Sequence, residues 1–328
     1  MEERKLLTSS ELLDKVRGKI SVVGIGNPDG LYAPIRYSLS AGGKRIRPVL
    51  MLLAYNMYKD DVDSIIENAL GLETYHNFTL LHDDLMDKAD VRRGTPTVHK
   101  KWDANTAILS GDAMLILAYK LMCGGKALRY PVALEAFTDA ALGVCEGQQY
   151  DMEFETRSDV CADEYMEMIR LKTSVLLACA LKVGALLADA PESDAELLYK
   201  AGENLGLAFQ LQDDCLDVYG DPAVFGKNIG GDILSNKKTF MLITALERAD
   251  AHNKAELEKY LSMRTFDPKE KISAVTAIYN AVGVREICEE RISSLFTETL
   301  ACLDAVELPE NLKTVLRSFV CGLMGRNS

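Results

Sequence analysis

The sequence predicts an all-α fold of about ten helices, in a single domain that spans residues 1–328. Three features lead to this prediction. Apolar residues recur with the helical period along nearly the whole chain, sustained period-two alternation is absent, and no low-complexity linker separates the helical runs. Length alone would favour about two domains, but the missing linker favours one, and the helices are too many for a four-helix bundle.

The first helices are predicted from the residues at their ends. Two long helical runs cover 63–90 and 103–122, and each begins with an aspartate, Asp63 or Asp103. Aspartate is a preferred N-cap residue, so we expect both to start these helices. The only β-like run, ISVVGIG at 20–26, is short.

The most apolar run of the chain, 173–190, is predicted to be a core helix. It contains Lys182 and falls short of the roughly 20 apolar residues of a membrane-spanning helix, so we expect no membrane span. The next helix, 193–220, is predicted to begin with a capping box formed by Ser193 and Glu196. Further helical runs follow towards the C-terminus.

Composition and charge narrow the classes of function. A net charge of −12 argues against a nucleic acid or an anionic membrane as partner, although a locally positive site could still bind an anionic substrate. The eight cysteines form no CxxC pair and mostly lie in apolar runs, so we expect them to be reduced and buried. Residues 1–13 mix both charge signs without an apolar segment, which predicts no targeting signal and a cytoplasmic protein.

Two acidic motifs of the same form, DDLMD at 83–87 and DDCLD at 213–217, each lie near the end of a long helical run. Residues i and i+4 of a helix share a face, so the outer carboxylates of each motif point the same way. Such paired oxygen ligands suit Mg²⁺. One motif alone could equally be a solvated acidic face, but two copies, each preceded by apolar residues, favour metal sites.

Several groups of cations accompany these motifs. Each alone is typical of an ordinary charged surface, but with two acidic motifs they predict a site for more than one polyphosphate. They are Lys44, Arg45 and Arg47 after a Gly-Gly turn, Arg92 and Arg93 after the first motif, Lys172 with Thr173 at an expected helix start, and Lys227, Lys237 and Lys238 in a glycine-rich segment.

The ordered motifs GGKRIRP, HDDLMD-x₄-RRG-x-PT, LKT, FQLQDDCLD and GKNIGGD, within residues 42–238, resemble those of the trans-type isoprenyl diphosphate synthases. This is the family of farnesyl and geranylgeranyl diphosphate synthases. The resemblance implies a homodimer of all-α subunits, each with a deep central cavity. It also implies a condensation in which an allylic diphosphate ionises with the help of about three Mg²⁺ ions. Isopentenyl diphosphate then attacks the cation, and loss of a proton leaves a product one isoprene unit longer.

The resemblance also implies roles for individual residues, and it requires no protein nucleophile. Mg²⁺ would be held by Asp83, Asp87 and Asp213, with Asp84 and Asp217 orienting metal-bound water. The allylic diphosphate would be clamped by Arg92, Lys172 and Lys227, with Thr173, Gln210 and Lys237 around it. Isopentenyl diphosphate would be bound without metal by Lys44, Arg47, His76 and Arg93. We further expect Asp90, one turn beyond Asp87, to pair with a nearby arginine.

Product length is predicted from the helix that precedes the first motif. Each isoprene unit adds about one helical turn, or 5.4 Å, to the tail. Phe78 would form the upper floor of the cavity and Tyr75 the lower one, whereas Thr79 is small and Gly71 offers no obstacle. We therefore expect farnesyl or geranylgeranyl diphosphate as product, without ranking the two.

Two alternatives remain open from the sequence. A class I terpene cyclase would share one acidic motif, but DDCLD and GGKRIRP count against it. A non-catalytic subunit of a heteromeric prenyl synthase would typically have lost acidic residues, and both motifs are complete here.

Overall fold

The computed structural model describes residues 6–124, 129–220 and 229–325. Its residues cluster into two compact units, and each is assembled from three separate segments of the chain. Unit 1 comprises Met1–Phe137, Cys179–Tyr199 and Val306–Phe319, and unit 2 comprises Thr138–Ala178, Lys200–Ala305 and Val320–Ser328. The single domain over residues 1–328 stays a prediction.

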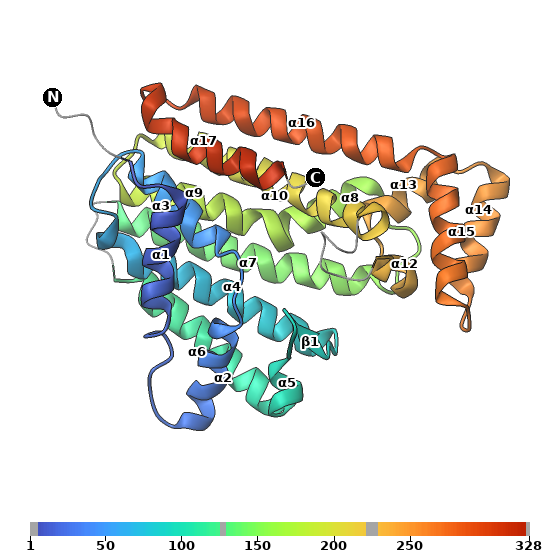
Figure 1. Cartoon of the computed structure of the whole chain (residues 1–328), viewed down its shortest axis with the longest axis horizontal. Helices are drawn as coiled ribbons and strands as arrows, with labels where there is room; N and C mark the ends of the chain where they lie inside the picture. The colour runs from blue at the N-terminus through green and yellow to red at the C-terminus, as the bar shows by residue number, and fades with distance from the viewer. Residues whose placement is uncertain (1–5, 125–128, 221–228, 326–328) are drawn as a thin grey trace. The chain divides into compact units, whose positions relative to one another are not determined.

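The first third of the chain forms most of unit 1 (Figure 1). Its long central helix follows a short 3₁₀ turn and packs along a second long helix. The elements are α1 (Ser9–Ile20), α2 (Asp29–Ser40), α3 (Ile46–Asn56), η1 (Val62–Ile65), α4 (Ile66–Met86), β1 (Val91–Arg92), β2 (Thr95–Pro96), α5 (Val98–Lys101) and α6 (Ala104–Met122). Gly71 of α4 makes the close α4–α6 packing achievable, because a Cβ there would lie 2.9 Å from the backbone oxygen of Ala118.

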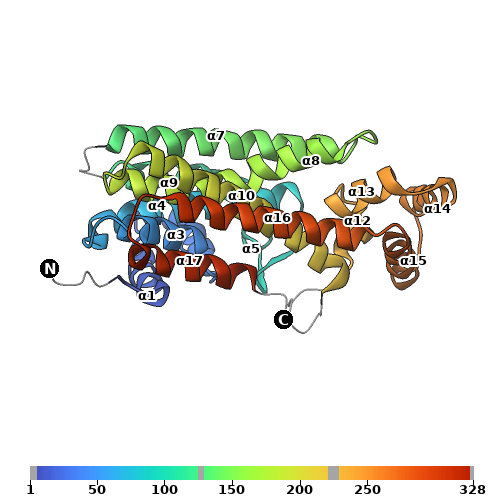
Figure 2. The same cartoon turned by 90° about the horizontal axis from the view of Figure 1, so that it is seen from above.

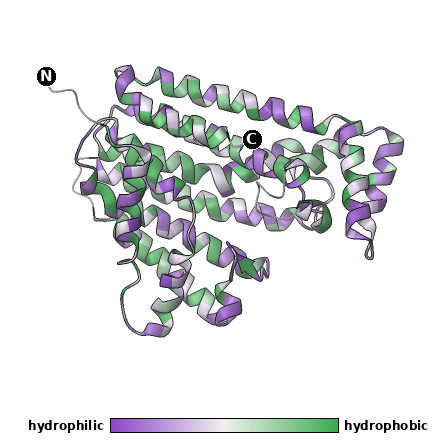
Figure 3. Cartoon of the chain, in the orientation of Figure 1, coloured by the Kyte–Doolittle hydropathy of each residue, from purple (hydrophilic) through white to green (hydrophobic). Residues whose placement is uncertain are grey.

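The later helices supply unit 2 and the remainder of unit 1. They are α7 (Tyr130–Phe154), α8 (Ala162–Ile169), η2 (Arg170–Ser174), α9 (Val175–Leu187), α10 (Glu192–Tyr219), α12 (Gly231–Ser235), α13 (Phe240–Arg248), α14 (Ala251–Ser262), α15 (Pro268–Ala281), α16 (Val284–Ala305) and α17 (Glu310–Met324). Within unit 2, α14 and α15 lie side by side (Figures 1 and 2). Hydrophobic and hydrophilic residues alternate along α16 (Figure 3), as expected of a helix with one buried face.

The predicted all-α fold is confirmed. In the described residues, the two-residue strands β1 and β2 are the only extended pairing. More than the ten predicted helices occur, because the structure also contains short helices such as α5 and α12 that periodicity does not resolve. The run 20–26 is not a strand, since α1 ends at Ile20 and a turn follows.

Of the three helix starts predicted from capping residues, two are wrong and one is confirmed. Asp103 caps α6, and its side chain accepts a hydrogen bond from the backbone nitrogen of Thr106. Asp63 lies inside the 3₁₀ turn η1 and pairs with Lys15 at 2.9 Å, so it does not cap α4. The helix α10 begins at Glu192, before Ser193, so the predicted capping box does not form its start.

The run 173–190 contains the predicted core helix, since every residue of α9 except Lys182 is buried. Among the described residues, no helix is long and apolar enough to cross a membrane. The prediction that the cysteines are buried is only partly right. Cys179, Cys215 and Cys288 are buried, but Cys123, Cys145, Cys161 and Cys321 are exposed. Cys123 and Cys161 lie at helix ends, where less of the chain covers them.

Candidate functional site

The first acidic motif lies at the C-terminal end of α4 in unit 1. Asp83 is in the last turn and Asp87 follows as the C-cap, with its backbone nitrogen 2.8 Å from the Asp83 carbonyl oxygen. Asp84 is turned inward and buried, and its carboxylate accepts a 2.7 Å hydrogen bond from Arg92 Nε. Burial raises the pKa of Asp84, and Arg92 opposes this rise. Arg92 also reaches Asp83 at 3.5 Å, so it already faces the motif.

A two-residue hairpin presents the arginines that follow the motif. The strands pair Arg92 with Thr95, and the turn residues Arg93 and Gly94 both have positive φ, 52° and 78°. The Arg93 guanidinium donates to the carbonyl oxygen of Gly42 and covers Gly43, where a Cβ would lie 2.7 Å from the guanidinium carbon. The glycine turn therefore brings the loop that carries Lys44, Arg45 and Arg47 against Arg93.

Arg45 in the same loop has a structural role. It is buried, with a φ of 48°, and pairs with Glu73 of α4 at 2.5 Å. Its guanidinium also donates to the carbonyl oxygen of Leu39, and the Asn77 amide donates to Glu73 at 2.8 Å. A buried ion pair with added hydrogen bonds fixes the loop, so the neighbouring cations are held in place.

Arg47 and His76 are brought together by α3 and α4. Arg47 Nη1 lies 3.1 Å from His76 Nε2, and Arg47 Nε has no hydrogen-bond partner among the described residues. Burial lowers the pKa of Arg47 to about 10, so it keeps its charge at neutral pH. Burial and then the Arg47 charge hold the pKa of His76 well below its usual range. His76 is therefore neutral and accepts a hydrogen bond from Arg47, since arginine has only donors.

Aromatic side chains of α4 line up below the first motif. Phe78 stacks edge-on against Tyr75, with ring centroids 5.4 Å apart, and Tyr75 in turn contacts Phe137 at 5.4 Å. Phe78 also contacts His82 at 4.9 Å, and Phe137 contacts Tyr119 at 5.1 Å. The two predicted floor residues are therefore part of one continuous aromatic stack within unit 1.

The second acidic motif lies in the last two turns of α10 in unit 2. Asp213 and Asp217 share a helix face, whereas Asp214 is buried and accepts hydrogen bonds from the Tyr165 hydroxyl and, at 3.1 Å, from Gln210. Burial raises the pKa of Asp214 to about 7. Thr173 donates to Gln210 at 3.3 Å, so two predicted substrate-binding residues are joined.

Lys172 and Thr173 lie in a π-helical turn. This turn, η2, connects α8 to α9, so the predicted helix start at these residues is wrong. Gly147 allows the turn to approach α7, because a Cβ there would lie 2.2 Å from the Lys172 backbone nitrogen. Lys172 pairs with Asp151 of α7 at 2.6 Å. π-Helical turns within α-helices are frequent at functional sites.

The segment after α10 adds Asp232 and Lys237 to unit 2. The backbone nitrogen of Asp232 donates to Asp217 Oδ2 at 3.0 Å, and the nitrogen of Lys237 donates to the Asp232 carbonyl oxygen at 2.9 Å. Lys237 is exposed. Lys227 lies outside the described residues.

Comparisons with known proteins identify the family to which the chain belongs. The model of the polyprenyl synthetase family matches residues 28–280. The geranylgeranyl diphosphate synthase of Methanosarcina mazei is 39% identical over 247 residues, which cover 72% of this chain and 76% of that protein. A crystal structure of a geranylgeranyl pyrophosphate synthase matches with a TM-score of 0.90 and 42% identity, over 97% of this chain and 98% of that one. The geranylgeranyl pyrophosphate synthase of Corynebacterium glutamicum, solved with isoprenyl diphosphate and magnesium, matches with a TM-score of 0.81 and 30% identity, over 97% of each chain.

The chain belongs to the polyprenyl synthetase family. It is a short-chain trans-prenyltransferase, as the resemblance of its motifs predicted. The relatives named above are all synthases, and nothing in the comparisons favours the terpene cyclase or the non-catalytic subunit.

The donor groups of the synthase suit magnesium. Each acidic motif offers a pair of carboxylates on one helix face, which are the hard oxygen ligands that Mg²⁺ prefers. In the described parts of the chain, no three His, Cys, Asp or Glu side chains converge to hold a metal on their own. A bound ion would complete its coordination with water and phosphate oxygens, as Mg²⁺ usually does.

The synthase also contains candidate site residues that the sequence did not reveal. Asp151 contacts the predicted residue Lys172, Asp214 contacts the predicted residue Gln210, and Tyr165 donates to Asp214. Asp214 could have been suspected only as the middle carboxylate of its motif. The prediction that Asp90 pairs with an arginine is wrong. Its exposed carboxylate pairs with Lys100 of α5 at 2.8 Å, and this hydrogen bond lowers the pKa of Asp90.

Proposed function

We propose that this synthase condenses isopentenyl diphosphate with dimethylallyl, geranyl or farnesyl diphosphate to give farnesyl or geranylgeranyl diphosphate. The observation that carries the proposal is that both acidic motifs end a long helix and that, in each unit, a predicted diphosphate-binding cation pairs with a carboxylate. Arg92 pairs with Asp83 and Asp84 in unit 1, and Lys172 pairs with Asp151 in unit 2. Such cations can exchange a carboxylate for a diphosphate oxygen without moving far.

The metal-dependent part of the site would use Asp83, Asp87 and Asp213 as ligands, with about three Mg²⁺ ions. Magnesium would supply positive charge where the departing diphosphate accumulates negative charge. The C. glutamicum relative contains magnesium with its ligand, which supports this choice of metal. The protein's own contribution would be to orient the allylic diphosphate through Arg92, Lys172 and Lys227, with Thr173, Gln210 and Lys237 around it.

Isopentenyl diphosphate would bind through side chains alone, at Lys44, Arg47, His76 and Arg93. The hydrogen bond to His76 aims the Arg47 guanidinium, and its Nε remains available as a donor. The packing of Arg93 over the glycine turn brings it close to the loop that carries Lys44. These contacts support one diphosphate site built from α3, α4 and the hairpin.

The prenyl tail would extend along α4 away from Asp83. Phe78 and Tyr75 are buried there, and the Thr79 hydroxyl is bonded to the His76 carbonyl oxygen at 2.8 Å. Thr79 therefore presents a small side chain in a region dominated by Phe78 and Tyr75. The geranylgeranyl names of the relatives support the longer of the two proposed products.

We also propose that the synthase is a cytoplasmic homodimer. The helix α6 exposes three large apolar residues, with Ile108, Leu109 and Ile116 at 47%, 61% and 69% exposure. Apolar side chains spaced along one helix are suited to contact with a second copy of the chain.

The proposal is tested by incubating the protein alone with Mg²⁺, geranyl diphosphate and labelled isopentenyl diphosphate. Labelled farnesyl or geranylgeranyl diphosphate supports it. A hydrocarbon product would instead indicate a cyclase, and no turnover would indicate a subunit that needs a partner.

A further inference from the structure

A buried lysine, Lys271 of α15, stands behind the segment that carries Lys237. Its side chain has no exposed surface, and its ammonium group donates to Asn236 Oδ1 at 2.6 Å and lies 4.2 Å from the centroid of the Phe266 ring. No carboxylate pairs with it in the described residues, and burial lowers the pKa of Lys271. A buried amine destabilises the fold unless polar groups compensate for its lost hydration, and Asn236 supplies this polar contact.

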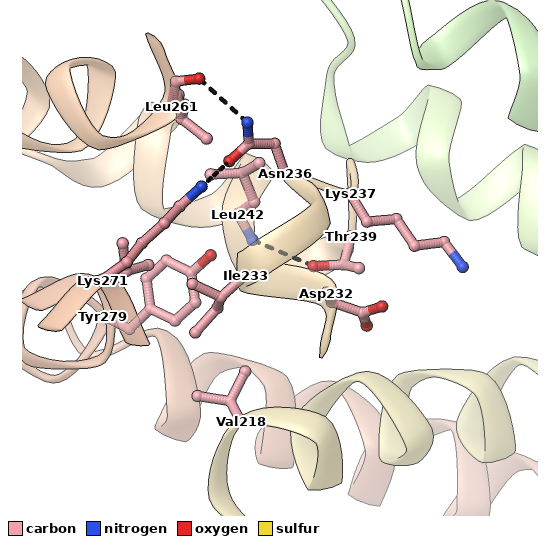
Figure 4. Close-up of a pocket in the computed structure, with 11 residues that line it drawn as sticks. Val218, Asp232, Ile233, Asn236, Lys237, Thr239, Leu242, Leu261, Lys271 and Tyr279 are labelled. Carbon is pink, nitrogen blue, oxygen red and sulfur yellow. Dashed lines mark hydrogen bonds between the residues drawn. The ribbon is translucent and has the colours of Figure 1, made fainter. Parts of the chain in front are cut away.

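Asn236 is the C-cap residue that directly follows α12. It adopts the left-handed conformation with a φ of 57°, which asparagine tolerates better than most residues. Its amide nitrogen donates to the carbonyl oxygen of Leu261, at the end of α14, at 3.0 Å. The side chain of Asn236 is thus held from two sides, by Lys271 and by Leu261 (Figure 4).

The same helix α15 also contacts the beginning of α12. Gly230, the residue before α12, has a φ of 82°, and a Cβ at this position would lie 2.6 Å from Ile272 Cδ1. Two consecutive residues of α15 therefore contact the two ends of α12. A helix of five residues is marginal by itself, so its placement depends on these contacts.

The opposite side of α12 faces the second acidic motif. The backbone nitrogens of Gly230 and Asp232 donate to Asp217, at its carbonyl oxygen (2.6 Å) and its carboxylate (3.0 Å). Figure 4 shows the side chains of Asp232 and Lys237 projecting away from Lys271. Because Lys237 directly follows Asn236, any shift of Asn236 moves the backbone of Lys237.

We propose that Lys271 is a positioning residue: it fixes Asn236, and through it holds Asp232 and Lys237 beside Asp217 of the second acidic motif. The inference rests on the proposed role of Lys237 in binding the allylic diphosphate. Lys271 itself touches no substrate.

The first test is Lys271→Met, which keeps the length of the side chain and removes the donor. We expect the KM for geranyl diphosphate, and the Kd for inorganic pyrophosphate with Mg²⁺ by calorimetry, to rise about tenfold. The KM for isopentenyl diphosphate should stay within about twofold, because its proposed site lies in unit 1. Lys313→Met is the matched control, since Lys313 is a buried lysine of unit 1 that donates to the Val306 carbonyl oxygen.

Two further variants separate positioning from loss of stability. In a Lys237→Ala background, Lys271→Met should add less than about twofold to either constant, because it acts through Lys237. Asn236→Gly removes the acceptor and keeps the left-handed backbone accessible, so it should reproduce the effect of Lys271→Met even if that variant folds poorly. The melting temperature of each variant is measured in parallel.

Unchanged constants in Lys271→Met and Asn236→Gly would overturn the inference. So would a full additional loss in the Lys237→Ala background, or an equal shift in Lys313→Met. If the unaltered protein binds pyrophosphate but makes no product, the proposed function fails while the calorimetric comparison still decides the role of Lys271. If it binds no pyrophosphate, both fail.

Discussion

Shortening Phe78 tests the proposed control of product length. The helical rise of 1.5 Å per residue places Phe78 about 7.5 Å below Asp83, and Tyr75 about 4.5 Å further down. The second interval is close to the length of one isoprene unit. Phe78→Ala should therefore allow one further condensation before the tail meets Tyr75. Adding Tyr75→Ala should lengthen the products again, until the tail meets Phe137, which contacts Tyr75 in the aromatic stack.

The structure limits how far this lengthening can continue. Gly71 was expected to offer no obstacle, but the backbone of α6 lies close to it, with the Ala118 carbonyl oxygen 2.9 Å from the position of a Cβ. The double variant should thus give a bounded distribution. Phe78 is only 8% exposed, and removing a buried phenylalanine side chain costs about 3–5 kcal/mol of stability, so assays should be run well below the melting temperature.

Chromatography of dephosphorylated products after incubation with geranyl and labelled isopentenyl diphosphate measures the result. Phe137→Ala alone is the control, because this fully buried ring lies below the proposed floors and its loss should destabilise the fold without lengthening the product. An unchanged distribution in the Phe78→Ala/Tyr75→Ala variant would place the floor on another helix and refute the reasoning.

The remaining predictions concern the diphosphate sites and the half-buried His76. Asp83→Ala or Asp213→Ala should lower kcat at least about a hundredfold while circular dichroism stays unchanged, because each removes a proposed metal ligand; near-normal turnover would refute the metal assignment. Lys44→Ala and Arg47→Ala should mainly raise the KM for isopentenyl diphosphate, whereas Arg92→Ala and Lys172→Ala should mainly raise the KM for the allylic substrate. Each loss should correspond to about 1.5–3 kcal/mol of binding free energy. If all four variants raised the KM of the same substrate, the assignment of these residues to two separate sites would be contradicted. Since the pKa of folded His76 is depressed, the unfolded chain binds the extra proton below pH 6.5, so stability falls as the pH drops. Urea unfolding should show that His76→Gln removes about 1 kcal/mol of the loss between about pH 7.5 and 5.5, and an identical loss in the variant would exclude His76 as its source.

Much of the fold was predictable because its causes are local. The helical period of apolar residues identifies α4, α6 and α10, and the Asp103 cap acts on a residue three positions away. The starts of α4 and α10 were misplaced because Asp63 is engaged by Lys15 of α1 and because the first turn of α10 begins at Glu192, before Ser193. The contact of Asp63 with Lys15 is not visible in a single window of sequence.

The features of the candidate site likewise fall into those that local sequence predicts and those that depend on tertiary contacts. The carboxylate pairs could be predicted because residues i and i+4 share a helix face whatever the tertiary structure. The π-helical turn at Lys172 could not, since it accompanies a close approach of α7 at Gly147. The inward turn of Arg45 depends on Glu73 of α4, and the partner of Asp90 on the placement of α5. These contacts join residues that sequence spacing does not relate.

Diffraction from crystals grown with Mn²⁺ and pyrophosphate tests most directly whether each acidic motif binds metal. Mn²⁺ takes oxygen ligands like those of Mg²⁺ and can be located by its anomalous signal. We expect anomalous peaks about 2.1 Å from carboxylate oxygens of Asp83, Asp87 and Asp213. Peaks at only one motif, or at neither, would contradict this expectation.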